Sequence, residues 1–253
     1  MDNETAKIKI RYSGDRALTV VFGERIDETV NEDVMRFCAR MDMLRSTDPR
    51  GAGLGEVIPC FCSALVNYRP ERISSSDAVA LAGTIAEEIL SGDSPEGTGM
   101  LTGRTLLIPC CYGGHFGPDM AAAENLTGLT REEIISIHSG TDYRVYMLGF
   151  LPGFVYLGGL DPRLELPRLK TPRVRIPRGS VGIGGQQTGV YPMDSPGGWQ
   201  LLGATPVDFY DPDRDEPILC RAGDRIRFFP VTSCDYYDIR QEILKGGKGW
   251  RSL

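Results

Sequence analysis

The densest group of chemically versatile side chains in the sequence is a run of cations between residues 163 and 178. Only Glu165 opposes them, so the segment carries +5 within a chain whose net charge is −6. A proline recurs every five residues from Pro162 to Pro177 and stiffens the backbone, so the side chains lose less entropy on binding. The cations are Arg163, Arg168, Lys170, Arg173, Arg175 and Arg178.

Two interpretations of this basic segment stay open. Guanidinium groups match carboxylate or phosphate oxygens in pairs, so the segment is typical of an anion site. It is equally typical of a solvated loop whose arginines pair with the protein's own acids, such as Asp208, Asp211 and Asp213.

A second candidate segment combines side-chain amides with glycines and an indole. Gln186 and Gln187 are adjacent, and Ser195-Pro-Gly-Gly-Trp199 follows them. Amides both donate and accept hydrogen bonds, and glycines beside Trp199 let the backbone approach a flat ligand. Turn formation and core packing explain the same residues, so this segment alone does not establish a binding site.

Aromatic residues alternate with glycines between residues 146 and 159, where Phe150 and Tyr156 are candidates for a pocket wall or for the core. His115, in a Gly-rich loop, is the most accessible candidate for a general base. A single loop histidine is more often without a catalytic role, and both interpretations remain open.

Several classes of function are disfavoured. The sequence contains no G-x-x-x-x-G-K-[ST] phosphate loop, no G-x-S-x-G and no H-E-x-x-H. Two histidines and seven cysteines without C-x-x-C spacing predict no metal site and reduced thiols, as in the cytoplasm. The acidic balance argues against nucleic-acid binding, and no apolar run predicts a signal peptide or a membrane span.

The elements that position these residues differ along the chain. Residues 1–99 predict mixed α and β structure, with helices from Asp27 or Thr29 to Leu44 and from Asp77 to Leu90, and a polar linker at about 91–99. Between residues 149 and 206, 12 Gly and 8 Pro exclude long helices.

Residues 100–253 therefore predict a barrel or sandwich of short strands. We expect two short helices within it, one from Pro118 to Asn125 and one from the capping box at Thr130 to His138. Beyond Thr141 the pattern predicts strands to the end of the chain. They are expected at 143–148, 181–183, 189–191, 199–205 and 224–230.

Taken in order, these segments resemble the family of allophanate hydrolase subunit 1, which includes the B subunit of bacterial 5-oxoprolinase and the sporulation kinase inhibitor. The likeness extends from Gly14-Asp-Arg-Ala-Leu18 across nearly the whole chain, although Arg178 stands where the family more usually has a small residue. The other matching residues are Tyr112-Gly-Gly, Gly117-Pro-Asp119, Gly149-Phe150, Pro152-Gly-Phe154, Tyr156-Leu-Gly-Gly159, Pro167-Arg168, Pro172-Arg173, Pro177, Gly179-Ser-Val181, Gly189-Val-Tyr191-Pro192, Ser195-Pro-Gly-Gly-Trp199, Gly203, Thr205-Pro206 and Pro212.

The resemblance implies an α+β protein with a small α/β N-terminal domain at 1–99 and a cyclophilin-like β-barrel domain at 100–253. It also implies a companion subunit of related barrel fold, resembling the C subunit of 5-oxoprolinase, together with a third subunit that resembles the A subunit. The implied activity is ATP-dependent opening of the lactam 5-oxo-L-proline to L-glutamate. ATP is then a co-substrate of the complex, and no bound cofactor is expected in this chain alone.

Within that activity we assign roles to the candidate residues. Arg168 and Arg173 hold phosphate or the substrate carboxylate, Gln187 orients the ring amide and His115 moves a proton. The expected substrate-binding residues are Phe150, Tyr156, Gln186, Ser195 and Trp199.

Other members of the family suggest other functions. One is inhibition of a sporulation-type histidine kinase, with the aromatic residues as anchors on the kinase. Another is a subunit of allophanate hydrolase or urea carboxylase, which would act on a different small amide.

Overall fold

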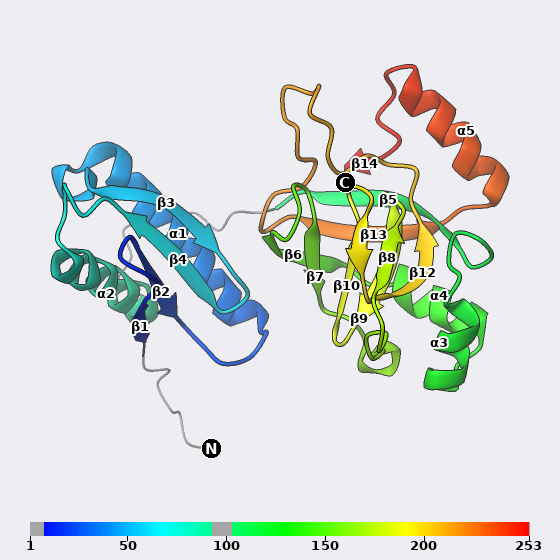
Figure 1. Cartoon of the computed structure of the whole chain (residues 1–253), viewed down its shortest axis with the longest axis horizontal. Helices are drawn as coiled ribbons and strands as arrows, with labels where there is room; N and C mark the ends of the chain where they lie inside the picture. Colours follow the sequence, from blue (N-terminus) through cyan, green and yellow to red (C-terminus); the bar gives the residue numbers. More distant parts are fainter. Residues whose placement is uncertain (1–7, 93–102, 253) are drawn as a thin grey trace. The chain divides into compact units, whose positions relative to one another are not determined.

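The computed structural model describes residues 8–92 and 103–252. The Cα positions cluster into two compact units, Met1–Leu101 and Thr102–Leu253, and both are drawn in Figure 1. Residues 93–99 of the expected linker lie outside the described residues. No helix in the described ranges is long and apolar enough to span a bilayer.

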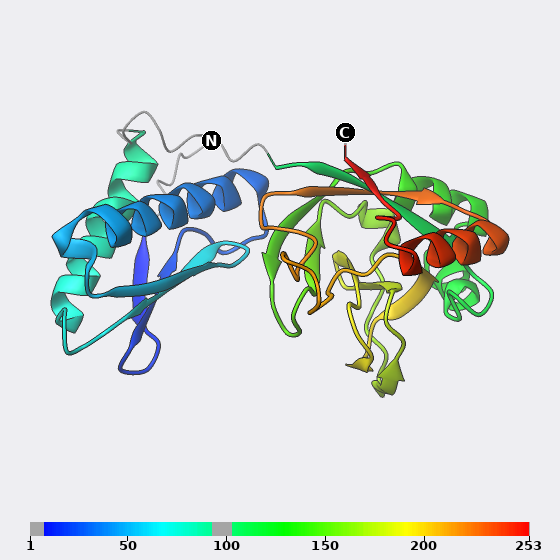
Figure 2. The same cartoon turned by 90° about the horizontal axis from the view of Figure 1, so that it is seen from above.

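The first unit is an antiparallel sheet with two helices packed on one face (Figures 1 and 2). Its strand order is β1-β2-β4-β3, and one core is shared by the sheet and both helices. A short 3₁₀ helix at Pro49–Gly51 precedes β3. The elements are β1 Lys9–Tyr12, β2 Ala17–Val21, α1 Glu28–Thr47, β3 Leu54–Pro59, β4 Ser63–Tyr68 and α2 Ser75–Ser91.

Local capping explains why both helices could be predicted. The Asp27 carboxylate accepts hydrogen bonds from the backbone N–H groups of Thr29 and Val30, and Ser74 caps α2 through Asp77 N. Gly92 ends α2 in the left-handed region at φ 79°. Both expected helices are confirmed, with α1 extending three residues beyond the predicted end at Leu44.

The second unit is a closed barrel of seven strands, in the order β12-β9-β10-β7-β6-β13-β5, with β5 also pairing with β12. The pairing of β13 with β5 is parallel, and the other pairings in the ring are antiparallel. The α+β fold with a barrel is therefore confirmed. The ring strands are β5 Thr105–Tyr112, β6 Tyr143–Leu148, β7 Val155–Gly158, β9 Ser180–Gly184, β10 Gln187–Val190, β12 Gln200–Ala204 and β13 Arg225–Pro230.

Further elements surround the ring. β8 (Arg173–Ile176) pairs with β11 (Ser195–Gly197), and β14 (Arg251–Ser252) adds to β5. A 3₁₀ helix covers Pro162–Leu164, and the helices are α3 Met120–Thr127, α4 Arg131–Ser139 and α5 Ser233–Leu244.

The helices of this unit test the sequence predictions. The capping box of Thr130 and Glu133 forms as expected at the start of α4. In contrast, α3 begins at Met120 rather than Pro118, and the expectation of strands alone beyond Thr141 was wrong because of α5. That helix has its own capping box, formed by Thr232 and Asp235.

Candidate functional site

Five aromatic side chains of the second unit line a cavity of about 110 Å³, here called the aromatic pocket. The Phe154 ring lies 4.9 Å from that of Tyr156, 5.2 Å from that of Tyr191 and 5.5 Å from that of Trp199. The contacts are tilted or edge-to-face, which is a favourable arrangement for aromatic rings. The complete lining is Phe150, Phe154, Tyr156, Arg168, Tyr191, Pro196, Gly197, Gly198 and Trp199.

Two barrel glycines fix the position of the Trp199 indole. A Cβ atom at Gly184 would lie 2.4 Å from Trp199 Cδ1, and one at Gly189 would lie 2.9 Å from Cζ3. Because any larger residue would collide with the ring, β9 and β10 form a flat surface on which the indole rests. Trp199 is only 4% exposed, so it forms a rigid wall of the pocket.

Arg168 is the cation among the residues that line the aromatic pocket. Burial raises the pKa of the Tyr156 hydroxyl, and the positive charge of Arg168 partly opposes this rise. Burial also raises the pKa of Tyr191, and a backbone hydrogen bond from Trp199 and the charge of Arg168 offset part of this rise. The charge of Arg168 therefore acts on both phenolic groups of the pocket.

The backbone on either side of Arg168 is held against the pocket wall. The Gln200 side-chain Nε2 donates to the Pro167 carbonyl at 3.1 Å, and Leu169 N donates to the Gly198 carbonyl at 2.7 Å. Within the described residues no carboxylate pairs with the Arg168 guanidinium. Its donors are therefore available to an anion.

Phe150 occupies a strained position at the mouth of the pocket. Leu151 N donates to Gly149 O at 2.7 Å, which closes a three-residue turn around Phe150. Phe150 has φ 64° and is the one non-glycine residue of the described ranges with positive φ, a conformation that costs energy in a γ-turn. Its ring lies 5.8 Å from that of Phe154 and is 64% exposed.

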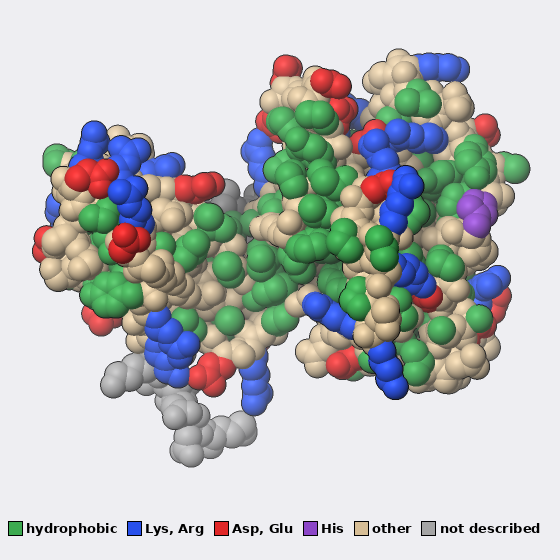
Figure 3. Space-filling view, viewed as in Figure 1, with side chains coloured by type: hydrophobic (Ala, Val, Ile, Leu, Met, Phe, Trp, Pro, Cys, Tyr) green, Lys and Arg blue, Asp and Glu red, His purple; other side chains and the backbone are tan. Residues whose placement is uncertain are grey.

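Most of the other cations of the basic segment pair with the protein's own acids. Arg173 contacts Asp119 at 2.6 Å, and Arg178 pairs with Asp208, one of the three acids considered from the sequence. Figure 3 shows basic and acidic groups interspersed with apolar ones on one face of this unit. The remaining pairs are Arg163 with Asp161 and Arg175 with Asp194.

The other predicted site residues lie outside the lining of the aromatic pocket. Gln186 Nε2 donates to Glu165 at 3.3 Å, whereas Gln187 is half-buried at the start of β10. The Ser195 hydroxyl is buried and has no hydrogen-bond partner within the described residues. His115 lies beside α5, where its Nε2 is 3.3 Å from the Tyr237 hydroxyl.

Gln200, Asp119 and Tyr191 contribute to the site, although they were not among the predicted site residues. Tyr191 lines the pocket, and Gln200 and Asp119 contact segments beside it. The signal available in the sequence was proximity, since Gln200 follows Trp199 and Tyr191 precedes Ser195 in the same motif.

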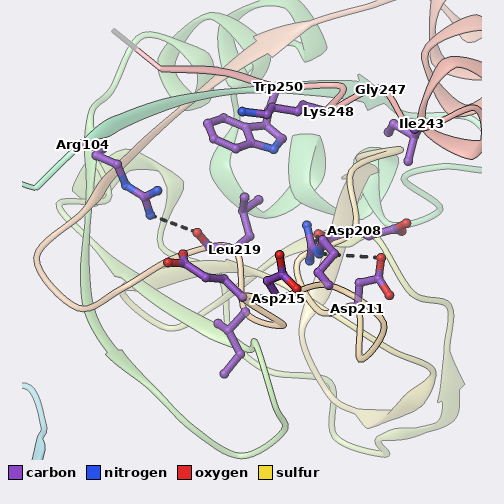
Figure 4. Close-up of a pocket in the computed structure, with 13 residues that line it drawn as sticks. Arg104, Asp208, Asp211, Asp215, Leu219, Ile243, Gly247, Lys248 and Trp250 are labelled. Carbon is purple, nitrogen blue, oxygen red and sulfur yellow. Dashed lines mark hydrogen bonds and ion pairs between the residues drawn. The ribbon is translucent and has the colours of Figure 1, made fainter.

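A larger cavity, of about 550 Å³, lies between the loop before β13 and the C-terminal segment. Figure 4 shows the Trp250 indole on one side and Asp208, Asp211 and Asp215 on the other. Several of its charged groups are paired internally, such as Arg104 with Asp224 and Asp208 with Arg240. None of the predicted site residues lines it.

Comparison with solved structures supports the fold. The crystal structure of urea amidolyase from Kluyveromyces lactis superimposes with a TM-score of 0.77 at 19% identity, over 100% of this chain and 17% of that chain. At that identity the likeness concerns the fold alone.

Sequence comparisons identify the family. The model of the carboxyltransferase domain, subdomain C and D, matches residues 8–220. The chain is 39% identical to the 5-oxoprolinase B subunit of Bacillus subtilis, over 94% of this chain and 99% of the relative. It is 53% identical to the 5-oxoprolinase B subunit of Escherichia coli O157:H7, over 50% of this chain and 58% of the relative. The chain therefore belongs to the carboxyltransferase subdomain C and D family, the family of the 5-oxoprolinase B subunit and of allophanate hydrolase subunit 1.

Proposed function

We propose that this chain is the B subunit of a cytoplasmic, ATP-dependent 5-oxoprolinase complex that hydrolyses 5-oxo-L-proline to L-glutamate. The near full-length similarity to a 5-oxoprolinase B subunit supports this proposal. In the complex, this chain works with a C-like companion subunit, and an A-like subunit is the third component.

The observation that carries the proposal is the pairing of flat aromatic walls with one available guanidinium in a small cavity. 5-Oxoproline has the matching parts: a small, nearly flat lactam ring and a carboxylate. The ring packs between Trp199 and Phe150, with Tyr156 beside it, while Arg168 binds the carboxylate. His115, Gln186, Gln187 and Ser195 receive no role in the aromatic pocket.

The reaction requires activation of a poor electrophile. Transfer of the γ-phosphoryl group of ATP to the lactam oxygen releases ADP and creates a leaving group. Water then adds to the carbon that bears this oxygen, the ring C–N bond breaks and the nitrogen takes a proton, which leaves γ-glutamyl phosphate. A second water hydrolyses this acyl phosphate to glutamate and inorganic phosphate. Because the sequence lacks the commonest phosphate loop, we assign ATP binding to the companion subunits.

Reconstitution tests this proposal. The chain is combined with the C-like and A-like subunits, and ADP and glutamate are measured with and without 5-oxoproline. We expect ATP hydrolysis that depends on 5-oxoproline and on this chain. Hydrolysis that proceeds equally with allophanate or urea, or no 5-oxoproline-dependent hydrolysis, would contradict the proposal.

The exposure of Phe150 favours a second candidate function. A 64% exposed phenylalanine on a strained turn is suited to anchor a protein partner, such as the helices of a sporulation-type histidine kinase. Micromolar protein added to such a kinase should then slow autophosphorylation, and Phe150→Ser should remove the effect. Unchanged autophosphorylation would exclude this function for the kinase tested.

A further inference from the structure

Asp119 occupies a helix N-cap position without acting as a cap. It precedes α3, yet its side chain makes no hydrogen bond to the first turn of that helix, although Asp is a favoured capping residue. Instead, its Oδ2 accepts from Leu201 N at 2.6 Å, and its own N–H donates to Leu201 O at 3.1 Å. The buried carboxylate thus binds the backbone two residues beyond Trp199.

The second oxygen of Asp119 reaches the same wall through Arg173. Oδ1 lies 2.6 Å from Arg173 Nη2, and Arg173 Nη1 donates to the Trp199 carbonyl at 3.4 Å. Asp119 is 8% exposed, and the Arg173 side chain is 29% exposed. One carboxylate therefore holds the backbone on both sides of Gln200, directly and through a guanidinium.

We propose that Asp119 and Arg173 are positioning residues that hold Trp199 in the wall of the aromatic pocket, and that Arg173 is not a ligand of the substrate carboxylate. An Arg173 guanidinium paired with a buried carboxylate is already neutralised, which weakens its attraction for a second anion. Arg168 has no such partner among the described residues and remains the anion ligand. The identity of the ligand rests on the proposed function, whereas the positioning of Trp199 does not.

Two ligands that differ in one carboxylate can distinguish a residue that positions Trp199 from a residue that binds the anion. 2-Pyrrolidinone has the lactam ring of 5-oxoproline but no carboxylate, and its inhibition constant can be measured in the reconstituted complex beside the KM for 5-oxoproline. We expect Arg173→Met and Asp119→Asn to weaken both ligands by the same factor, about tenfold. Arg168→Met should weaken 5-oxoproline and leave 2-pyrrolidinone unchanged. If Arg173→Met weakened the binding of 5-oxoproline but not that of 2-pyrrolidinone, the proposal would be overturned.

A spectroscopic test is independent of the ligand. In a Trp250→Phe background Trp199 is the remaining tryptophan, so its emission reports on the wall directly. Arg173→Met should shift this emission to longer wavelength as the indole gains contact with water, and Arg173→Lys should restore part of the original spectrum. Unchanged emission in Arg173→Met would show that Arg173 does not hold Trp199 in place. This result would be valid even if 5-oxoproline does not bind and the proposed function is wrong.

Arg227→Met is the matched control. Arg227 also pairs with a distant carboxylate, that of Asp142, at 2.6 and 2.7 Å, and neither residue lines the pocket. It should change neither the Trp199 emission nor either ligand constant. If Asp119→Asn does not fold, the two Arg173 variants and this control still decide the outcome.

Discussion

Arg168 differs from its neighbouring arginines in how it is held. The backbone on each side of it is tied to the pocket wall by hydrogen bonds from Gln200 and Leu169, while its guanidinium has no acidic partner within the described ranges. A residue whose backbone is held in place and whose guanidinium has no acidic partner can bind an anion at small entropic cost.

Substitution of Arg168 should therefore act on binding. In the reconstituted complex, Arg168→Met should raise the KM for 5-oxoproline about ten- to hundredfold, the range for hydrogen bonds to charged groups, with a smaller change in kcat. Steady-state kinetics measures both constants. Arg163→Met is the control, because Arg163 pairs with Asp161 at the surface; an equal effect of the two substitutions would rule out the assigned role.

The backbone of Phe150 predicts an unusual order of stability. At most positions Ala is more stabilising than Gly, but φ 64° at Phe150 reverses that preference. Phe150→Gly should have a free energy of unfolding about 1 kcal/mol higher than Phe150→Ala. Denaturant unfolding of both variants measures the difference, and a more stable alanine variant would mean that the turn relaxes when the ring is removed.

At the scale of elements, the glycines of β9 and β10 have a packing role that can be tested. Gly184→Ala would place a methyl group 2.4 Å from Trp199 Cδ1, so it should destabilise the protein by about 1–3 kcal/mol and weaken ligand binding. In Gly83→Ala, on α2, the added methyl group would have no neighbour closer than 3.6 Å. This substitution should raise the free energy of unfolding by about 0.5–1 kcal/mol. Chemical denaturation measures the change in the free energy of unfolding for both variants. A loss of stability in Gly184→Ala together with a gain in Gly83→Ala would support the packing role, whereas changes of the same sign would refute it.

The attachment of α4 to the barrel predicts a dependence of stability on pH. His138 on α4 is fully buried, lies 2.7 Å from the Tyr112 hydroxyl and 2.9 Å from Thr188 Oγ1, and stacks on Phe228. Burial lowers the pKa of His138 from 6.5 to about 3. The unfolded chain therefore binds a proton that the folded chain does not bind between these values.

The contribution of neutral His138 to stability is fully present above pH 6.5 and is lost as the pH falls towards about 3. The free energy of unfolding should fall by up to about 1.4 kcal/mol per pH unit below pH 6. Urea unfolding between pH 5 and 8 measures this slope, and His138→Gln should flatten it. A variant that retains the full slope would assign it to other groups.

The elements also show what the sequence could predict. Helices α1 and α4 were predictable because Asp27 and Thr130 signal their starts locally. The short strands β8 and β11 were not, because each is stabilised by the other and not by its own three or four residues. Helix α5 carried a local signal in Thr232 and Asp235 that the strand pattern around it obscured.

The same distinction applies to the site. Phe150, Tyr156, Arg168 and Trp199 were predicted, and they line one pocket. The pairing of Arg173 with Asp119, 54 residues away, could not be read from either residue because it depends on the closure of the barrel. Pairings between distant residues are therefore the part of the site that required the structure.

At the scale of the whole molecule, the two units contribute unequally to the proposed activity. All residues that line the aromatic pocket lie between Phe150 and Trp199, in the second unit. The family match nevertheless spans residues 8–220 and so includes both units. The N-terminal unit accordingly belongs to the family pattern without supplying a side chain to the pocket.

The position of β5 in the barrel also determines the order of events during synthesis of the chain. β5 is the first strand of its unit, but its partners are β12, β13 and β14, which emerge from the ribosome about 90 to 145 residues later. The first unit can fold during translation, whereas β5 must wait for the C-terminal strands. During that interval the unpaired N–H and C=O groups of β5 and its apolar side chains Leu106 and Ile108, buried in the finished barrel, are exposed, which favours pairing with other chains.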